Sequence, residues 1–185
     1  MNLKPCIPQE AIDETVKRLA AEINNDYRGR TPLLVGVLKG AFLFLSDLVR
    51  KLDIEHEVDF IQTACYGHRD TPAADVLIVR DITADLLGRD VIIVEDIIDR
   101  GHTAKALMTY FSDRGAASIR LCTLLKREGG APGLAPGLKA DYTGAVIGPG
   151  FVVGYGMDYK ERLRGLPGLY TIQEEGETWM DLPGS

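Results

Sequence analysis

The sequence lacks the features that mark several large classes of protein. Its 185 residues include only three cysteines, which are scattered without paired spacing and are typical of reduced thiols rather than a disulfide framework. No stretch approaches the length of apolar sequence that a membrane helix needs, and the first ten residues, MNLKPCIPQE, contain no apolar signal segment. We therefore expect a cytoplasmic protein that does not contact membranes.

The sequence also has too little positive charge for a general nucleic-acid binder. It carries 21 lysines and arginines against 27 aspartates and glutamates, a net charge of −6, whereas broad nucleic-acid binding needs a basic surface. It contains neither a Walker A loop nor a GxGxxG motif, and this argues against ATPase and dinucleotide chemistry. No nucleic-acid partner is expected.

The hydrophobic pattern that is present predicts a single α/β domain. Hydrophobic residues make up 45% of the chain, enough for a sizeable core. Apolar runs without alternation are typical of strands buried on both faces, and they alternate with segments of helical spacing, so we expect a largely parallel central sheet flanked by helices. Helices are predicted over 9–27, 41–52 and 101–114, and strands over 32–38, 57–65, 76–81, 91–96, 118–125, 151–156 and 168–172. The two strands around the polar loop 66–75 are expected to be antiparallel.

The most informative stretch is VIIVEDIIDRGHT, residues 91–103, where acids follow a buried strand. Ligands of such sheets bind at the carboxyl ends of the strands. Gly101 and the start of a helix would form a phosphate cradle, whereas Glu95 and Asp96 suit sugar hydroxyls or Mg²⁺. The stretch therefore indicates a sugar phosphate bound with Mg²⁺. The alternative is a solvated corner in which Asp99 is only a helix N-cap.

VIIVEDIIDRGHT resembles the diphosphoribosyl-binding signature of type I phosphoribosyltransferases. Three further segments occur in the order found in the hypoxanthine-guanine members of that family: LVGVLKGAFLFLSDLVR (34–50), VDFIQTACYG (58–67) and FVVGYGMDYKERLRGLP (151–167). The resemblance implies a type I phosphoribosyltransferase fold with a core at about 10–125 and a tail at 173–185. A small base-binding hood at about 126–172 would also include the amino-terminal segment.

The resemblance implies transfer of the 5-phosphoribosyl group of 5-phosphoribosyl diphosphate to hypoxanthine or guanine, with Mg²⁺ as cofactor. Asp99 would act in proton transfer at N7 of the base. The 5′-phosphate would bind to residues of the loop, namely Asp99, Arg100, Gly101, His102 and Thr103. Glu95 and Asp96 would hold the ribose hydroxyls, with Mg²⁺ near Glu95, Asp96 and Asp158. Relatives form homodimers or homotetramers, and one of these states is expected here.

The other segments imply the remaining contacts. Lys39, Gly40 and Arg164 would bind pyrophosphate, and the Leu38–Lys39 peptide is cis in relatives. The purine would meet the ring of Phe151, the backbone of Val152 and the neighbourhood of Asp158. Residues 66–75 have the composition of a mobile loop that closes over the active site, and Cys65, Tyr66 and Gly67 begin it.

The sequence departs from the family pattern at two positions that matter for binding. Arg100 stands where threonine or serine is usual. Either its guanidinium binds the 5′-phosphate, or its side chain points to solvent and backbone N–H groups of the loop bind the phosphate. We expect the second arrangement. The family lysine that binds the purine O6 corresponds to Arg127 by strict counting, or to Lys126 with a one-residue deletion. Since strand side chains alternate, only one of these can face the base.

Two other functions remain open at this point. The same reaction could prefer xanthine, because the approach to the base, IGPGFVV, differs from relatives. The chain could also be a non-catalytic regulator that senses the sugar diphosphate. Retention of Asp99 and Lys39, and the lack of an added basic domain, favour the enzyme.

Overall fold

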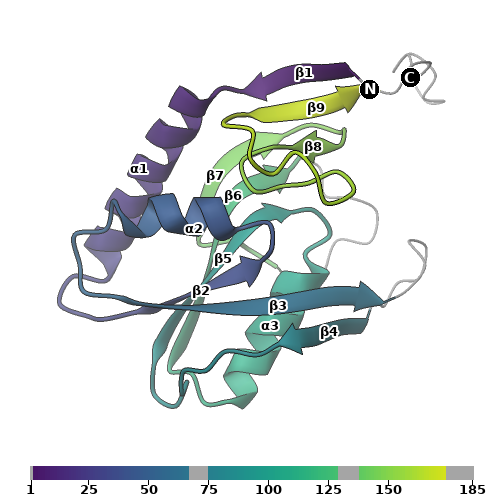
Figure 1. Ribbon diagram of the computed structural model, residues 1–185. Coiled ribbons are helices and arrows are strands. Elements are labelled where there is room, and N and C mark those ends of the chain that lie inside the picture. Colours follow the sequence, from purple (N-terminus) through teal and green to yellow (C-terminus); the bar gives the residue numbers. More distant parts are fainter. Residues whose placement is uncertain (1, 67–74, 129–137, 174–185) are drawn as a thin grey trace.

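The computed structural model describes residues 2–66, 75–128 and 138–173, which form two sheets and three helices (Figure 1). The large sheet has six strands in the order β4-β3-β2-β5-β6-β7, and the small sheet has three in the order β1-β9-β8. The helices are α1 (Gln9–Asp26), α2 (Phe42–Val49) and α3 (His102–Asp113). The strands are β1 (Asn2–Ile7), β2 (Leu33–Leu38), β3 (Glu57–Tyr66), β4 (Asp75–Arg80), β5 (Asp90–Ile98), β6 (Ser118–Arg127), β7 (Tyr142–Ile147), β8 (Val152–Val153) and β9 (Leu169–Gln173).

The large sheet is parallel apart from β4, which pairs antiparallel with β3. The predicted parallel sheet and its antiparallel excursion are thus confirmed. β2 and β5 read as unbroken apolar runs because both of their faces are covered. Ile92 and Val94 pack with α1 and α2 on one face, whereas Val91 and Ile93 pack with α3 on the other. Within the described ranges, no helix is both long and apolar enough to cross a membrane.

The strand predictions erred where the apolar signal was short or mixed. β1 and β7 were not predicted: β1 contains Lys4 and Pro5, and the YTGAVI of β7 is too weakly apolar to stand out. β7 joins the large sheet although its residues fall in the range expected for the hood. The predicted strand 151–156 is reduced to Val152–Val153, because Gly154 and Gly156 have positive φ values of 98° and 100° that end the extended conformation.

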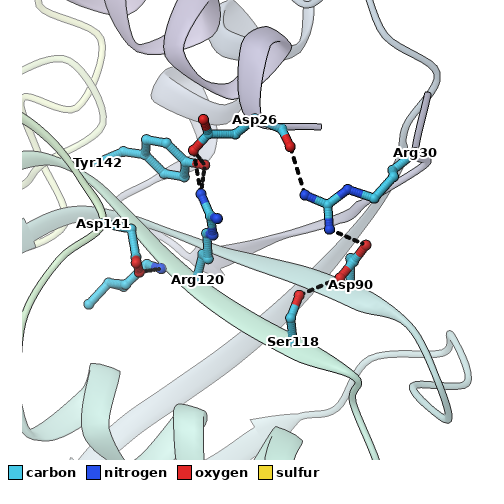
Figure 2. Close-up of polar contacts among 8 residues, drawn as sticks. Asp26, Arg30, Asp90, Ser118, Arg120, Asp141 and Tyr142 are labelled. Carbon is cyan, nitrogen blue, oxygen red and sulfur yellow. Dashed lines mark hydrogen bonds and ion pairs between the residues drawn. The ribbon is translucent and has the colours of Figure 1, made fainter. Parts of the chain in front are cut away.

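α1 is amphipathic as predicted, and its apolar stripe of Ile12, Val16, Leu19, Ala20 and Ile23 is buried. The end of α1 is tied to the amino ends of three strands by a polar network (Figure 2). Arg120 of β6 donates to Asp26 and, at 2.6 Å, to the hydroxyl of Tyr142. That hydroxyl donates to Asp26 at 2.9 Å, and the pKa of Asp26 is lowered by Tyr142 and then by Arg120. Arg30 bridges to Asp90 of β5 at 3.1 Å.

This network lies at the amino ends of the strands and leaves their carboxyl ends for other groups. The buried ring of Tyr27 lies between two of its cations, with Arg30 4.5 Å and Arg120 5.4 Å from the ring centroid. The guanidinium groups keep their carboxylate partners while covering an aromatic face. The network therefore fixes the helix against the sheet at the end opposite the acidic residues of β5.

The packing of α1 on β7 predicts that Gly144→Ala destabilises the fold. A Cβ at Gly144 would lie 2.3 Å from the carbonyl oxygen of Leu124 and 2.9 Å from Cγ2 of Thr15. Overpacking of this kind costs about 1–3 kcal/mol, which lowers the melting temperature by roughly 3–10 °C. Gly148→Ala is the matched control, because nothing lies within 4 Å of its added Cβ. Equal melting temperatures for the two variants in calorimetry would contradict the prediction.

Candidate functional site

The carboxyl ends of β2, β5 and β6 lie side by side, because these strands are parallel neighbours. β5 was predicted to end at Asp96, but it continues to Ile98. Glu95 and Asp96 are therefore inside the strand, and Glu95 is only 4% exposed. Asp99 is the first residue after β5. Of the three predicted acids in this stretch, two therefore lie within the strand and the third lies just beyond its end.

The ionised forms of Glu95 and Asp96 are unfavourable in the protein without a bound cation. Burial, and then repulsion from Asp96, raises the pKa of Glu95 to about 8. Burial raises the pKa of Asp96 to about 6 although backbone N–H groups oppose the rise. Ionised carboxylates in such a place are stabilised by a cation, and oxygen donors suit a hard one such as Mg²⁺.

Among the described residues, no three histidine, cysteine or acidic side chains are grouped closely enough to hold a metal by themselves. Glu95, Asp96 and Asp158 therefore do not form a closed protein cage. This arrangement still fits Mg²⁺, which usually keeps several waters and is held by one or two carboxylates together with substrate phosphates.

The loop after β5 has the geometry expected of a phosphate cradle. Gly101 has φ = 73° and is the N-cap of α3, with no side-chain cap hydrogen bond. A Cβ at Gly101 would lie 2.2 Å from Cδ2 of Leu138, so the backbone there packs directly against this side chain. Asp99 precedes the cap and does not serve as one. Three other residues of this loop are partly buried, namely Arg100, His102 and Thr103. Arg100 and Thr103 each have an interaction partner. Whether the Arg100 side chain binds a phosphate stays a prediction.

Arg127, at the end of β6, is the basic residue that reaches Asp99. Its Nε donates to Oδ1 of Asp99 at 2.9 Å, and Nη1 donates to the carbonyl oxygen of Gly148 at 2.7 Å. The Arg127 side chain is 17% exposed and that of Asp99 50%. Because side chains alternate along β6, Lys126 points to the opposite face. The structure thus places Arg127 at the catalytic candidate.

The loop after β2 lies against the strand acids. The Leu38–Lys39 peptide is cis, as the resemblance predicted. A Cβ at Gly40 would lie 1.9 Å from Oδ2 of Asp96, and a Cβ at Gly156 would lie 2.1 Å from the carbonyl oxygen of Gly40. Two glycines are therefore needed to stack this loop between Asp96 and the segment around residue 156.

Glu161 contacts both Lys39 and Arg164, which are 125 positions apart in the chain. The sequence did not single out Glu161. Oε2 of Glu161 lies 3.0 Å from Nζ of Lys39 and 3.3 Å from Nη2 of Arg164. Arg164 also contacts Oδ1 of Asp158 at 2.8 Å and donates to the carbonyl oxygen of Gly156 at 2.8 Å. Glu161 could have been suspected only from its position between two expected anion-binding segments.

Phe151 has the exposure expected of a ring that stacks on a ligand. Its side chain is 51% exposed, and its ring meets that of Tyr159 edge-on, with centroids 5.8 Å apart. Val152 is buried in β8, which pairs with β9. Tyr159 was another residue that the sequence reading missed. Residues 67–74 of the loop predicted at 66–75, Gly67 among them, lie outside the described residues, whereas Cys65 and Tyr66 are residues of β3 and Asp75 is the first residue of β4.

The match to a protein-family model decides the relationship of this chain. Residues 8–160 match the model described as the phosphoribosyl transferase domain. The chain belongs to the phosphoribosyl transferase family. This confirms the family and fold that the signature at 91–103 predicted.

Within the phosphoribosyl transferase family, the proteins similar to this chain include enzymes of the hypoxanthine-guanine type. The chain is 42% identical to the hypoxanthine-guanine phosphoribosyltransferase of Streptococcus pneumoniae strain R6, covering 93% of this chain and 94% of that protein. It is 41% identical to the bifunctional protein TilS/HprT of Listeria innocua, but it spans only 26% of that longer protein. A crystal structure of a hypoxanthine-guanine phosphoribosyltransferase from Bacillus anthracis matches with a TM-score of 0.86 and 35% identity, over 93% of this chain and 100% of that one.

The raised pKa values predict a pH-dependent effect of Glu95→Gln on stability. Glu95 is protonated in the folded protein up to pH about 8, but ionises in the unfolded chain near its ordinary pKa of about 4.3. Wild-type stability therefore falls as pH rises through this window, whereas glutamine is unaffected. In chelator and without substrates, we expect the variant to melt close to wild type at pH 5 and several degrees higher at pH 8.

Exposed Glu57, whose side chain is 56% accessible, offers Glu57→Gln as a control for the loss of one negative charge. A difference between Glu95→Gln and wild type that stays constant from pH 5 to pH 8 would contradict the assignment of Glu95 as a buried, neutral acid.

Proposed function

We propose that this protein transfers the 5-phosphoribosyl group of 5-phosphoribosyl diphosphate to N9 of hypoxanthine or guanine, giving IMP or GMP and pyrophosphate, as a purine-salvage enzyme of the cytoplasm. The observation that carries the proposal is the pairing of Asp99 with Arg127 at the same strand ends as Glu95 and Asp96. This places a proton acceptor and a cationic donor side by side, next to acids that suit a sugar.

The pair matches one edge of a 6-oxopurine. Such a purine presents N7 and O6 side by side, whereas adenine presents N7 beside an amino donor. Asp99 accepts the proton that N7 releases as N9 bonds to the ribose, and Arg127 donates to O6. An amino group in place of O6 would face the guanidinium with donor against donor. The pair therefore favours hypoxanthine and guanine over adenine, with the base lying against Phe151.

The remaining residues act on the sugar diphosphate. Glu95 and Asp96 hold the ribose hydroxyls; as the ions that a nearby Mg²⁺ would favour, they stabilise positive charge that develops at the anomeric carbon as the bond to the diphosphate breaks. The loop from Asp99 to Thr103 binds the 5′-phosphate, and Lys39, Gly40 and Arg164 bind the diphosphate. Mg²⁺, held with the diphosphate near Asp96 and Asp158, would neutralise the leaving group. The segment that follows Cys65 and Tyr66 at the end of β3 would close over the site and exclude water.

A second copy of the chain is the proposed partner. Strands β3 and β4 expose four apolar side chains, Val58, Phe60, Leu77 and Val79, with accessibilities of 37–55%. A homodimer or homotetramer that covers this surface would remove the apolar area from water.

The activity assay offers hypoxanthine, guanine, xanthine and adenine separately, each with 5-phosphoribosyl diphosphate and Mg²⁺, and follows nucleotide and pyrophosphate. We expect turnover with hypoxanthine and guanine, none with adenine, and loss of turnover on exhaustive chelation. Asp99→Asn, which removes the proton acceptor, should lower kcat about 10²–10⁴-fold. Preferential use of xanthine would support the second candidate specificity, and binding of the sugar diphosphate without turnover of any base would support a regulator.

Arg127 predicts a separate effect on base recognition. Loss of a hydrogen bond from a charged group costs about 1.5–3 kcal/mol, so Arg127→Met should lower kcat/KM for hypoxanthine roughly 10- to 150-fold while KM for the sugar diphosphate stays within threefold. Lys126→Met is the matched control, because Lys126 is the adjacent cation in β6 and its side chain points to the opposite face of the strand. If instead Lys126→Met were the damaging variant in steady-state kinetics, the O6 contact would belong to Lys126.

A further inference from the structure

Glu161 forms a bridge whose geometry resembles that of a bound diphosphate oxygen. A single carboxylate oxygen, Oε2, lies 3.0 Å from the Lys39 ammonium and 3.3 Å from the Arg164 guanidinium. These are the two cations assigned to the diphosphate. An anionic oxygen between them already holds the position that a diphosphate oxygen would take.

We propose that Glu161 is a displaceable internal anion, which occupies the diphosphate position between Lys39 and Arg164 and leaves it when 5-phosphoribosyl diphosphate or pyrophosphate binds. The inference rests on the proposed function, because that function assigns Lys39 and Arg164 to the diphosphate. It adds that the chain itself competes with both the substrate and the released product.

The exposure of the bridge supports displacement rather than a structural role. The Glu161 side chain is 66% exposed and that of Lys39 53%. Exposed ion pairs contribute little to stability, so breaking this one leaves the fold intact. Glu161 also lies in a tight turn in which Lys160, Glu161 and Leu163 have positive φ values of 52°, 62° and 72°. The turn, rather than the core, sets where the carboxylate points.

The two cations are anchored unequally, and this indicates how the exchange proceeds. Arg164 is 20% exposed and keeps its contacts with Asp158 and the Gly156 carbonyl when Glu161 moves away. For Lys39, Glu161 is the side-chain partner among the described residues. A diphosphate therefore binds to the Arg164 guanidinium, which is held in place, and replaces Glu161 as the partner of the Lys39 ammonium. The carboxylate then returns as pyrophosphate leaves, which favours product release.

The test measures binding of inorganic pyrophosphate with Mg²⁺ by calorimetry to the full chain and to four variants: Glu161→Gln, Glu161→Ala, Lys39→Met and the double variant Lys39→Met/Glu161→Ala. Exposed pairs are worth up to about fivefold each. Removing a carboxylate that contacts two cations should therefore tighten pyrophosphate binding about three- to tenfold, and lower KM for the sugar diphosphate in parallel. Glu57→Gln removes one exposed, ion-paired acid elsewhere and should change neither value by more than twofold.

The outcomes separate the inference from the function on which it rests. Lys39→Met should weaken pyrophosphate binding, and the gain from Glu161→Ala should be smaller in the double variant, because only the contact with Arg164 remains to be removed. If wild type binds pyrophosphate and Lys39→Met weakens it, yet both Glu161 variants bind it equally or less tightly than wild type, the inference is wrong and the function stands. If wild type binds no pyrophosphate, the assigned diphosphate site fails and the inference fails with it.

Discussion

The cost of placing two adjacent carboxylates inside a strand governs the architecture around β5. Burial raises the pKa of both Glu95 and Asp96, and repulsion from Asp96 adds to the rise at Glu95. The fold tolerates them because the sheet is completed by apolar packing on both faces of β5, with α1 and α2 on one side and α3 on the other. Everything that binds a substrate in the proposed site is arranged around these two acids at the carboxyl edge of the sheet.

The charged groups of the candidate site and those of the structural network lie at opposite ends of the same strands. At the amino ends, Asp26, Arg120 and Tyr142 satisfy one another, and that network anchors the first helix (Figure 2). At the carboxyl ends, the acids are either buried with a raised pKa, as in Glu95, or paired through exposed contacts, as in Lys39 and Glu161. A site of this kind keeps its binding groups close together while leaving their interactions available to a ligand.

The sequence was sufficient for the parts of the molecule whose signal is local. The five buried positions of α1, the apolar runs of β2 and β5, and the presence of acids toward the end of β5 follow from the sequence pattern, although the predicted end of β5 was two residues too early. β1 and β7 could not be found in the same way, because their pairing depends on partners far along the chain. The choice between Lys126 and Arg127 needed the register of β6, since one residue of slip exchanges the two faces. Glu161 was missed because the two cations that it contacts, Lys39 and Arg164, come from segments far apart in the chain.

The pairing of β1 with β9 has a consequence for how the molecule forms. Asn2 of β1 lies opposite Gln173 of β9, so the small sheet joins segments that are almost the whole chain apart (Figure 1). During synthesis, β2 through β7 can pair while the strand that receives β1 has not yet been made. The edge that carries Glu95 and Asp96 can therefore form before the small sheet beside Phe151, and the small sheet is the last part of the described fold to close. A nascent chain stalled before residue 169 would contain the loop after β5 but lack β9, the strand with which both β1 and β8 pair.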